Sequence, residues 1–377
     1  MQIINSIQGH RSVRQAVRRT AAFFGSALVF VLLAAGAAYA QSDAAFKNLI
    51  AAAKKEGKVI VDGPPVTEIR AALVSGFQNK YGITVEYISS GSSTSGARVR
   101  AERAAEKYQL DVFHSGADTP LLTFVPGGWC DSAEAALVDP AAMDPSKWLD
   151  NHVWYMDPSR IILRTSRQVS GTLAINTKLV KPGEITKWDD LLNPKWKGKI
   201  ITKDPSISGA GASLTSYLYL KKGAKFVETL YKTQQPIVSR DSRQSLQWLA
   251  QGNYPILVGP DSTQLDNLAS RGFPIEFVEV TDGPGVMTGG WCAICLMNKA
   301  PNPNAAKLYV NWIASREGQE ILSKASGQVS LRTDVSREGV PDYALPNKGR
   351  EYLDTYEYKF VTEEREEAFK KVREMLR

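Results

Sequence analysis

Short apolar segments alternate with amphipathic helical segments, and this alternation limits the fold more than any other feature of the chain. Residues 59–61, 84–88 and 110–113 are short and apolar, which is typical of buried strands. A segment with apolar residues three and four apart separates the first two, and a charged helix is predicted at 97–107 before the third. Strands that alternate with helices in this way predict an α/β sheet with helices on both faces.

A second alternating region covers residues 185–277, with strands predicted near Ile200, Ile237, Ile256 and Ile275. Residues 161–175 lie between the two regions and form a long β-rich stretch, whose length suits a strand that leaves one domain and enters another. We therefore predict two α/β domains. The predicted boundaries are 41–165 plus 286–328 for domain I, and 166–285 plus 329–377 for domain II.

The remaining predicted elements follow the second region. Residues 291–297 are predicted to form a strand, and residues 304–315 and 317–323 two helices. The tail, 363–377, has the composition of a charged helix, which we expect to be solvated.

The first forty residues have the pattern of a secretory signal peptide. Four arginines, at positions 11, 14, 18 and 19, precede an apolar run, and Ala38-Tyr39-Ala40 ends it as a small-x-small cleavage site. A retained membrane anchor is the alternative, because the apolar run approaches spanning length. Export through this leader predicts a periplasmic protein that begins at Gln41.

The leader also carries most of the positive charge of the chain. The sequence has 46 basic and 39 acidic residues, and removing the four leader arginines leaves 42 against 39, a net charge of about +3. No basic stripe with interleaved aromatic residues follows the leader. Nucleic-acid binding therefore has no support in the sequence.

Three cysteines, Cys130, Cys292 and Cys295, form an odd set for an exported protein. Cys292 and Cys295 have the spacing of a redox motif, but such a motif needs its first cysteine at a helix N-terminus, and these flanks predict a strand. Residues three apart on a strand point to opposite faces, so this pair is not expected to form a disulfide. A disulfide between Cys130 and one of the pair, and three buried free thiols, are the two alternatives.

The segment 185–208 carries the clearest functional pattern. An apolar strand near Ile200 ends at Asp204-Pro205, and a loop of small residues, Ser208-Gly209-Ala210, then leads into a helix. This arrangement presents backbone N–H groups to a small anion. Ligands of α/β sheets lie beyond the carboxyl ends of the strands, so loops 63–67, 89–96 and 115–119 are expected to face the same ligand.

These loops, with neighbouring polar and aromatic residues, supply the candidate ligand contacts. The candidates are Thr67, Ser92, Ser93, Thr94, Ser208, Gly209, Ala210, Arg240, Asp261, Ser262 and Trp291. For the hydroxyl residues and Gly209, ordinary helix capping is the alternative role, and capping is compatible with anion binding.

The remaining candidates have structural alternatives of other kinds. Arg240 either donates hydrogen bonds from its guanidinium to a phosphate or carboxylate of the ligand, or forms a surface ion pair. Asp261 accepts from an amine or hydroxyl of the ligand, or forms a turn. Trp291 forms a wall of the cleft or packs in the core. His114 and His152 have no metal-ligand spacing and are predicted to be structural, so no metal site and no cofactor is predicted.

Four stretches resemble a known family. These are residues 59–87, which include KYGITVE at 80–86, then 110–113, 185–208, and 298–319, which begins NKAPNPNAA. Together they resemble the type II periplasmic solute-binding proteins of bacterial ABC importers, in the branch that includes the ferric-ion-binding proteins. The resemblance implies two α/β domains joined by crossover strands, which close on a solute in the cleft between them. It also implies a monomeric, non-enzymatic protein that delivers its cargo to an inner-membrane permease.

The chain departs from the ferric branch at the metal ligands. In that branch a His, a Glu and two adjacent tyrosines hold the iron, with an anion on a Ser-Gly-Ala helix start. The corresponding positions are Pro64-Pro65, Gly116 and residues 259–262, and none of these ligands is present. The anion loop remains as Ser208-Gly209-Ala210. Hard ferric iron needs oxygen ligands of this kind, so the resemblance implies an anion cradle without its metal.

We therefore expect capture of a small anionic solute, such as a phosphate ester, a phosphonate or a carboxylate. Ferric iron with a synergistic anion is the first alternative. An exported hydrolase is an alternative of another class, although the chain has no Gly-x-Ser-x-Gly elbow. A sensor subunit that signals to a membrane kinase is a further alternative to an importer subunit.

Overall fold

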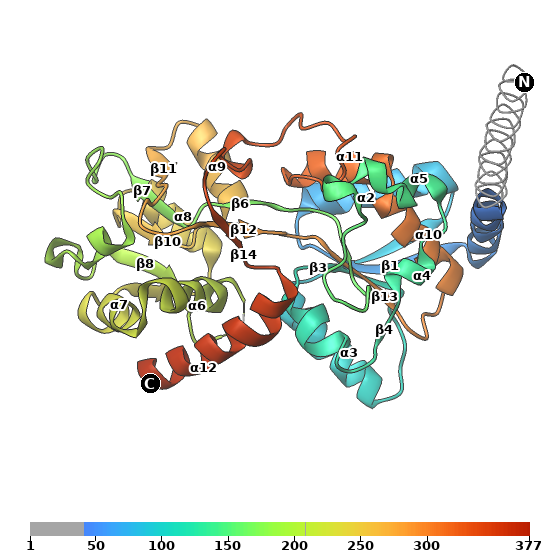
Figure 1. Cartoon of the computed structure of the whole chain (residues 1–377), viewed down its shortest axis with the longest axis horizontal. Helices are drawn as coiled ribbons and strands as arrows, with labels where there is room; N and C mark the ends of the chain where they lie inside the picture. The colour runs from blue at the N-terminus through green and yellow to red at the C-terminus, as the bar shows by residue number, and fades with distance from the viewer. Residues whose placement is uncertain (1–40, 208) are drawn as a thin grey trace, which may run out of the picture.

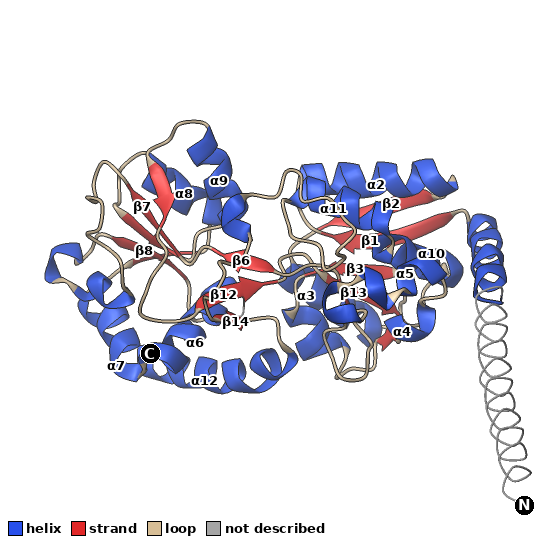
Figure 2. Ribbon diagram, turned by 45° about the horizontal axis from the view of Figure 1, so that its top comes forward, coloured by secondary structure: helices blue, strands red, loops and turns tan. Residues whose placement is uncertain are grey.

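The structure is a computed structural model that describes residues 41–207 and 209–377. These residues form two α/β lobes, and a narrow group of strands, β6, β12 and β14, lies between them (Figures 1 and 2). The leader and Ser208 lie outside the described residues, so the signal-peptide prediction is not tested here. Within the described part of the chain, no helix is long and apolar enough to cross a membrane.

The first lobe is built on a six-stranded mixed sheet, in which β1 pairs in parallel with β2 and β3, and β13 is antiparallel to β3. Its spatial order is β2-β1-β3-β13-β4, with β5 also paired to β13. The strands are β1 Lys58–Gly63, β2 Thr84–Ser89, β3 Val112–Ser115, β4 Cys130–Asp131, β5 Leu163–Arg164 and β13 Ala293–Met297. All five residues of β13 are buried, which confirms the strand predicted near 291–297.

Helices of the first lobe cover this sheet and bury an aromatic cluster in which the rings of Phe77, Tyr309 and Trp312 pack together. Residues 41–56 are helical. The other helices are α2 Thr67–Tyr81, α3 Ser92–Ala104, α4 Ala133–Ala136, α5 Pro140–Met143, α10 Pro303–Ala314 and α11 Arg316–Ser326, with a π-helix at Pro120–Phe124 and 3₁₀ turns at Pro145–Lys147 and Leu149–Asn151. Gly82 ends α2 at φ 69°, a left-handed conformation that glycine adopts without strain.

The second lobe is built on a five-stranded sheet of order β11-β7-β10-β8-β9. Its strands are β7 Leu173–Asn176, β8 Ile200–Lys203, β9 Ile237–Ser239, β10 Ile256–Val258 and β11 Ile275–Phe277. The four strands predicted from isoleucines are therefore confirmed. Its helices are α6 Ala210–Lys222, α7 Ala224–Glu228, α8 Ser242–Ala250, α9 Ser262–Ser270 and α12 Arg365–Leu376, with π-helices at Thr229–Thr233 and Phe360–Glu364 and 3₁₀ turns at Trp188–Leu192 and Pro194–Trp196.

A three-stranded sheet of order β14-β12-β6 forms the waist between the lobes, with β6 Gln168–Ser170, β12 Gly285–Thr288 and β14 Tyr352–Asp354. The β-rich stretch 161–175 is three strands rather than one, because β5, β6 and β7 belong to the three different sheets. The chain thus passes between the lobes here. The segment that returns to β14 contains a 3₁₀ turn at Asp342–Ala344. The predicted domain boundaries stay a prediction, since the waist strands belong to neither large sheet.

Three local predictions are wrong. Thr67 does not cap α2, because Val66 occupies the N-cap position and Thr67 is already helical. The loop predicted over 89–96 is shorter, since Ser92 begins α3. The C-terminal helix is not wholly solvated, because α12 buries Arg365, Ala368 and Val372 where it packs on α6.

A disulfide joins Cys130 of β4 to Cys295 of β13, and Cys292 is a buried free thiol. Met297 of β13 is paired with Cys130 in the register of the two strands, which brings the cysteine positions together. Of the two alternatives left open by the sequence, the structure therefore contains the disulfide with Cys130. Cys292 directly precedes β13 and Cys295 lies within it, and the two are not bonded to each other, as expected.

Candidate functional site

Among the residues that the structure describes, no side-chain oxygen caps three helices that follow the carboxyl ends of strands, α2, α3 and α6, and two of these, α3 and α6, have glycine at the N-cap. Helix α3 follows β2 and has Gly91 as its N-cap, and α6 follows β8 and has Gly209 as its N-cap. Neither glycine offers a capping oxygen from a side chain. The first N–H groups of a helix have no partner within the helix, and the helix dipole makes this end electropositive. Both helix starts can therefore donate to an anion.

Two other helices of the second lobe are capped by aspartates. The carboxylate of Asp241 accepts from the backbone N–H of Gln244 at the start of α8, and that of Asp261 accepts from Gln264 at the start of α9, each over 3.0 Å. These carboxylates satisfy the N–H groups and place negative charge at the helix ends. An anionic ligand is thus favoured at α3 and α6, and disfavoured at α8 and α9.

A chain of polar contacts links the starts of α3 and α6. The hydroxyl of Ser92 donates to Oγ1 of Thr119 over 2.9 Å. Asp118, the neighbour of Thr119, accepts from the guanidinium of Arg365 over 2.5 Å. The same guanidinium donates to Oγ of Ser213, in the first turn of α6, over 3.1 Å. The two uncapped helix starts, one in each lobe, therefore lie on either side of one polar cluster.

Lys203 adds an unpaired positive charge beside the start of α6. It is the last residue of β8, and its side chain passes close to Gly211 of α6 and to Gly259, which follows β10. Among the described residues, no hydrogen bond or ion pair is recorded for its amino group. Burial lowers the pKa of Lys203, while the charge of Asp261 acts in the opposite direction. Lys203 is partly buried, and a partly buried cation without a partner is costly, so an anionic ligand would offset that cost.

The first lobe also holds a buried carboxylate at the end of β1. Asp62 accepts from Ser95 over 2.9 Å, from Ser90 over 3.2 Å and from Arg98 over 2.6 Å. Burial raises the pKa of Asp62, and the hydrogen bonds from Arg98 and Ser95 oppose that rise. This network ties α3 to the sheet, so it positions the α3 start.

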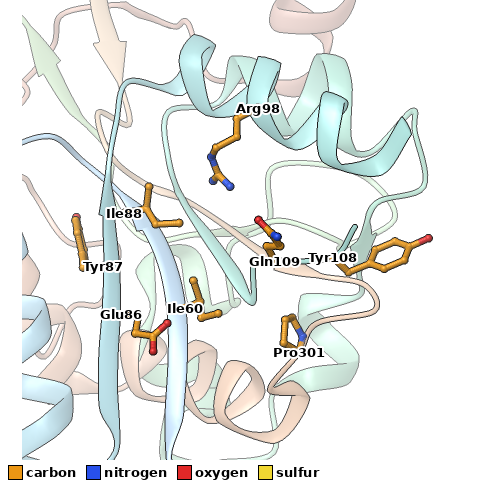
Figure 3. A pocket seen from close by; sticks show the side chains of 8 residues that line it. All are labelled: Ile60, Glu86, Tyr87, Ile88, Arg98, Tyr108, Gln109 and Pro301. Carbon is orange, nitrogen blue, oxygen red and sulfur yellow. The ribbon is translucent and has the colours of Figure 1, made fainter. Parts of the chain in front are cut away.

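A groove of about 440 Å³ lies beside this network, under α3 (Figure 3). Arg98 extends into it from α3, above Ile60 and Glu86 of the neighbouring strands (Figure 3). The two terminal nitrogens of Arg98 already donate to Asp62 and Glu102, so its guanidinium is occupied. The groove therefore adds no free cation to the site.

Most of the residues predicted from the sequence lie at the carboxyl ends of the two sheets. Ser92, Ser93 and Thr94 form the first turn of α3, and Gly209 and Ala210 begin α6. Ser208 lies outside the described residues. Thr67 is exposed in the first turn of α2.

The other predicted contacts have partners within the protein. Arg240 forms an ion pair with Asp204 over 2.7 Å, and its side chain is 70% exposed. Ser262 accepts from the backbone N–H of Gly171 over 3.1 Å. Trp291 is half-buried, and its backbone accepts from His114 and donates to Gln328.

Sequence reasoning missed Lys203, Asp118 and Arg365. Lys203 had a usable signal, because it is the last residue of a predicted strand that leads into the anion loop. Arg365 had none, since it lies in a charged segment 152 residues from Ser213 in the sequence, and only the docking of α12 brings it to Ser213 and Asp118.

The histidines occupy ordinary structural positions. His114 is fully buried, and its Nε2 lies 3.0 Å from the carbonyl oxygen of Trp291. Its pKa is lowered to about 4 by burial. His152 is exposed and its ring packs near that of Trp154. Within residues 41–207 and 209–377, no cluster of three or more His, Cys, Asp or Glu side chains has the arrangement of a metal site.

Comparison with known proteins identifies a family and related folds. The family model for bacterial extracellular solute-binding proteins matches residues 72–346. An uncharacterized protein of Haemophilus influenzae is 28% identical over 354 residues, which cover 90% of this chain and 94% of that protein.

The similar solved structures are periplasmic binding proteins. AfuA from Actinobacillus pleuropneumoniae, with exogenous fructose-6-phosphate bound, has a TM-score of 0.68 and 19% identity, over 85% of this chain and 98% of AfuA. Iron-bound HitA from Pseudomonas aeruginosa has a TM-score of 0.65 and 16% identity, over 84% of this chain and 99% of HitA. The ferric binding protein from Campylobacter jejuni has a TM-score of 0.64 and 15% identity, over 84% of this chain and 99% of that protein. At these identities the likeness establishes the type II periplasmic binding protein fold.

Proposed function

Because the chain belongs to the bacterial extracellular solute-binding proteins, which serve ABC transporters, we propose that its cargo is a small anionic solute held between the two lobes. A phosphate ester, a phosphonate or a carboxylate has the required chemistry. The observation that carries this proposal is the pair of uncapped helix starts, at α3 and α6, with the unpaired amino group of Lys203 beside the second. Family membership also excludes the hypothesis of an exported hydrolase, since these proteins bind solutes and are not enzymes.

The binding step follows from the two-lobe architecture. The lobes are joined through the short strands of the waist, which allows an open form and a closed form to exchange. An anion that accepts from α3 in the first lobe and from α6 in the second stabilises the closed form, because only that form offers both sets of donors. Lys203 contributes charge from the second lobe alone, so it increases affinity in either form.

Ferric iron with a synergistic anion is the second candidate, and the likeness to iron-bound HitA favours it. The positions that correspond to the metal ligands of the ferric branch are occupied by Pro64-Pro65, Gly116 and residues 259–262. Asp261, within the last of these, is already engaged at the start of α9. We therefore rank this candidate below an organic anion. The likeness to AfuA, whose structure contains fructose-6-phosphate, supports the organic anion.

Location and partners are part of the same proposal. Residues 1–40 would direct export to the periplasm, where the chain from Gln41 acts as a monomer and docks on an inner-membrane permease. Copurification with a permease supports the importer role, whereas copurification with a membrane kinase would identify a sensor subunit.

Thermal-shift measurements on the chain from Gln41 test the nature of the cargo. The panel consists of phosphate esters, phosphonates, carboxylates, amino acids, polyamines, thiamine and ferric citrate. A ligand at one hundred times its Kd stabilises the native state by about 2.7 kcal/mol, so a true cargo raises Tm clearly. We expect a shift with one anionic class.

A matched pair of lysine variants tests the site. Lys203→Gln should weaken binding of that anion about tenfold or more, because it removes a charge-assisted contact. Lys199→Gln, at the exposed beginning of the same strand region, should leave binding unchanged. A shift with polyamines alone, or a coloured complex with iron whose stability does not depend on Lys203, would reject the organic anion.

A further inference from the structure

A cavity of about 440 Å³ lies against the waist of the molecule and is separate from the uncapped helix starts. Its wall includes Arg167, which directly precedes β6, Met287 of β12 and Tyr352 of β14. Val329 of the first lobe and Val340 of the segment that returns to β14 complete it on either side. In Figure 1 that returning segment crosses the top of the molecule, whereas α6 and α12 lie at the bottom. The volume is within the range of small-molecule sites, roughly 300–1,000 Å³.

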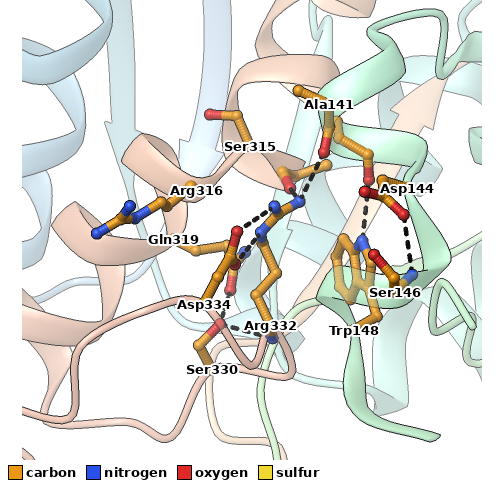
Figure 4. Close-up of polar contacts among 12 residues, drawn as sticks. Ala141, Asp144, Ser146, Trp148, Ser315, Arg316, Gln319, Ser330, Arg332 and Asp334 are labelled. Atoms are coloured by element: carbon orange, nitrogen blue, oxygen red, sulfur yellow. Dashed lines mark hydrogen bonds and ion pairs between the residues drawn. The ribbon is translucent and has the colours of Figure 1, made fainter. Parts of the chain in front are cut away.

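All the charged side chains that line this waist cavity are positive. It contains four arginines, Arg167, Arg332, Arg337 and Arg350, and no aspartate or glutamate. Two of the four are neutralised by acids outside the cavity. Arg332 donates to both carboxylate oxygens of Asp334 and to two backbone carbonyls (Figure 4). Arg350 pairs with Glu279 and donates to the carbonyl of Val280.

The other two arginines retain donors. Nε of Arg167 lies 3.0 Å from Asp354, but the same carboxylate also pairs with the buried Arg164 over 2.9 Å. One acid therefore serves two guanidinium groups and leaves an excess positive charge. Among the described residues, the terminal nitrogens of Arg167 have no recorded hydrogen bond, and Arg337 is exposed and has no recorded ion pair.

We propose that the waist cavity is a second binding site, for a small oxyanion such as phosphate or the phosphate group of a monoester, with Arg167 and Arg337 as its principal donors. A guanidinium forms two parallel hydrogen bonds to a phosphate, and its charge persists at every physiological pH. The hydroxyl of Thr333, which also lines the cavity, supplies a neutral donor. This site goes beyond the proposed cargo site and uses none of its residues.

The position of the site links it to the movement of the lobes. Arg167 directly precedes the waist strand β6, and the backbone N–H of Arg167 donates to the carbonyl oxygen of Val329 of the first lobe over 3.0 Å. Arg337 lies in the segment that returns to β14, which contacts the second lobe through Asn347 and Glu279. An oxyanion that joins Arg167 to Arg337 favours one arrangement of the lobes over others, because the distance between its donors changes when the waist bends.

Isothermal titration with inorganic phosphate tests the site, on the chain from Gln41 in phosphate-free buffer at constant ionic strength. Lys203→Gln removes the charge at the cargo site, and phosphate binding at the waist should persist in this variant. Adding Arg167→Gln or Arg337→Gln should weaken that binding about tenfold each, through loss of charge-assisted hydrogen bonds. Arg316→Gln removes an exposed arginine of α11 outside the cavity and should have no effect.

Each other outcome contradicts the proposal. If the Lys203→Gln protein does not bind phosphate, the proposal of a waist site is rejected. The proposal of a cargo site is not affected by that result. Equal weakening by Arg316→Gln would show general charge attraction instead of a site. If Arg167→Gln prevents folding, Arg337→Gln still tests the site, because Arg337 is exposed and its substitution should not disturb the fold. Phosphate should also change the small-angle scattering profile of the Lys203→Gln protein, and an unchanged profile would reject the link to lobe movement.

Discussion

The guanidinium of Arg365 donates to the carboxylate of Asp118 over 2.5 Å, which joins the C-terminal helix α12 to the residues that follow β3. Arg365 is almost completely buried, with 2% of its side chain exposed, whereas Asp118 is 22% exposed. Helix α12 packs on α6 of the second lobe, and β3 belongs to the sheet of the first. This ion pair is therefore a contact between the lobes beside the proposed cargo site.

Asp118→Ala should lower the free energy of unfolding by about 3 kcal/mol, because it removes the main partner of a buried guanidinium. Arg365→Met should cost less, since it removes the buried charge itself and keeps an apolar side chain of similar length. Urea denaturation measures both values. Arg316→Ala, at an exposed ion pair of α11, is the control and should leave stability unchanged. A larger loss for Arg365→Met than for Asp118→Ala would contradict this account.

Gly91 offers a test of the anion-binding role of α3. Its φ is −71° and ψ 149°, a conformation open to any residue, and a Cβ added there would meet no atom within 4 Å. Gly91→Asn and Gly91→Asp should therefore both cap α3 and stabilise the protein by roughly 0.5–2 kcal/mol. Only the aspartate places negative charge at the helix start, so only Gly91→Asp should weaken binding of an anionic cargo, about tenfold.

Calorimetric titration of both Gly91 variants with the same cargo makes this comparison, and denaturation curves confirm that each cap forms. Equal affinity in the two variants would show that the α3 start does not face the ligand. Equal loss in both would point instead to steric exclusion by the new side chain.

We expect the buried imidazole of His114 to make the folded protein less stable in mild acid. Burial lowers its pKa to about 4, whereas the imidazole of an unfolded chain titrates near 6.5. Between these values the unfolded chain binds a proton that the folded protein does not bind, so acid favours unfolding. The contribution of neutral His114 to the free energy of unfolding is fully present above pH 6.5. It decreases by roughly 3 kcal/mol as the pH falls to about 4. Unfolding free energies at several pH values should show a shallower decrease for His114→Gln than for the wild type.

The disulfide and the free thiol predict a specific pattern of reactivity. Reduction of the Cys130–Cys295 bond should lower the stability by about 2–4 kcal/mol, because this bond constrains the unfolded chain over a separation of 165 residues. Burial raises the pKa of Cys292 to about 12, so its thiol should not react with a maleimide in the native protein. After denaturation without reductant, one thiol per chain should react. Three reactive thiols would show that the disulfide does not form in the exported protein.

Local sequence patterns predicted the strands and most of the helices well, because those patterns act over a few residues. Four isoleucine-centred strands of the second lobe lie where alternation placed them. The loop after β8 was identified as a helix start, although the structure does not describe Ser208. Two of the three errors lie at helix starts, where Val66 and Ser92 depend on how the chain leaves the preceding strand, and the third concerns α12, whose burial depends on its packing against α6.

The sequence by itself determined the class of fold and the chemical character of the loop that leads into α6, since both follow from short-range periodicity and residue type. Only the tertiary structure decided which helix starts are free for a ligand, because Asp241 and Asp261 cap α8 and α9 whereas Gly91 and Gly209 leave α3 and α6 open. The meeting of Arg365 with Asp118, and of Cys130 with Cys295, also needed the folded chain. Contacts between residues more than a hundred positions apart depend on how whole elements pack, and no local pattern records that packing.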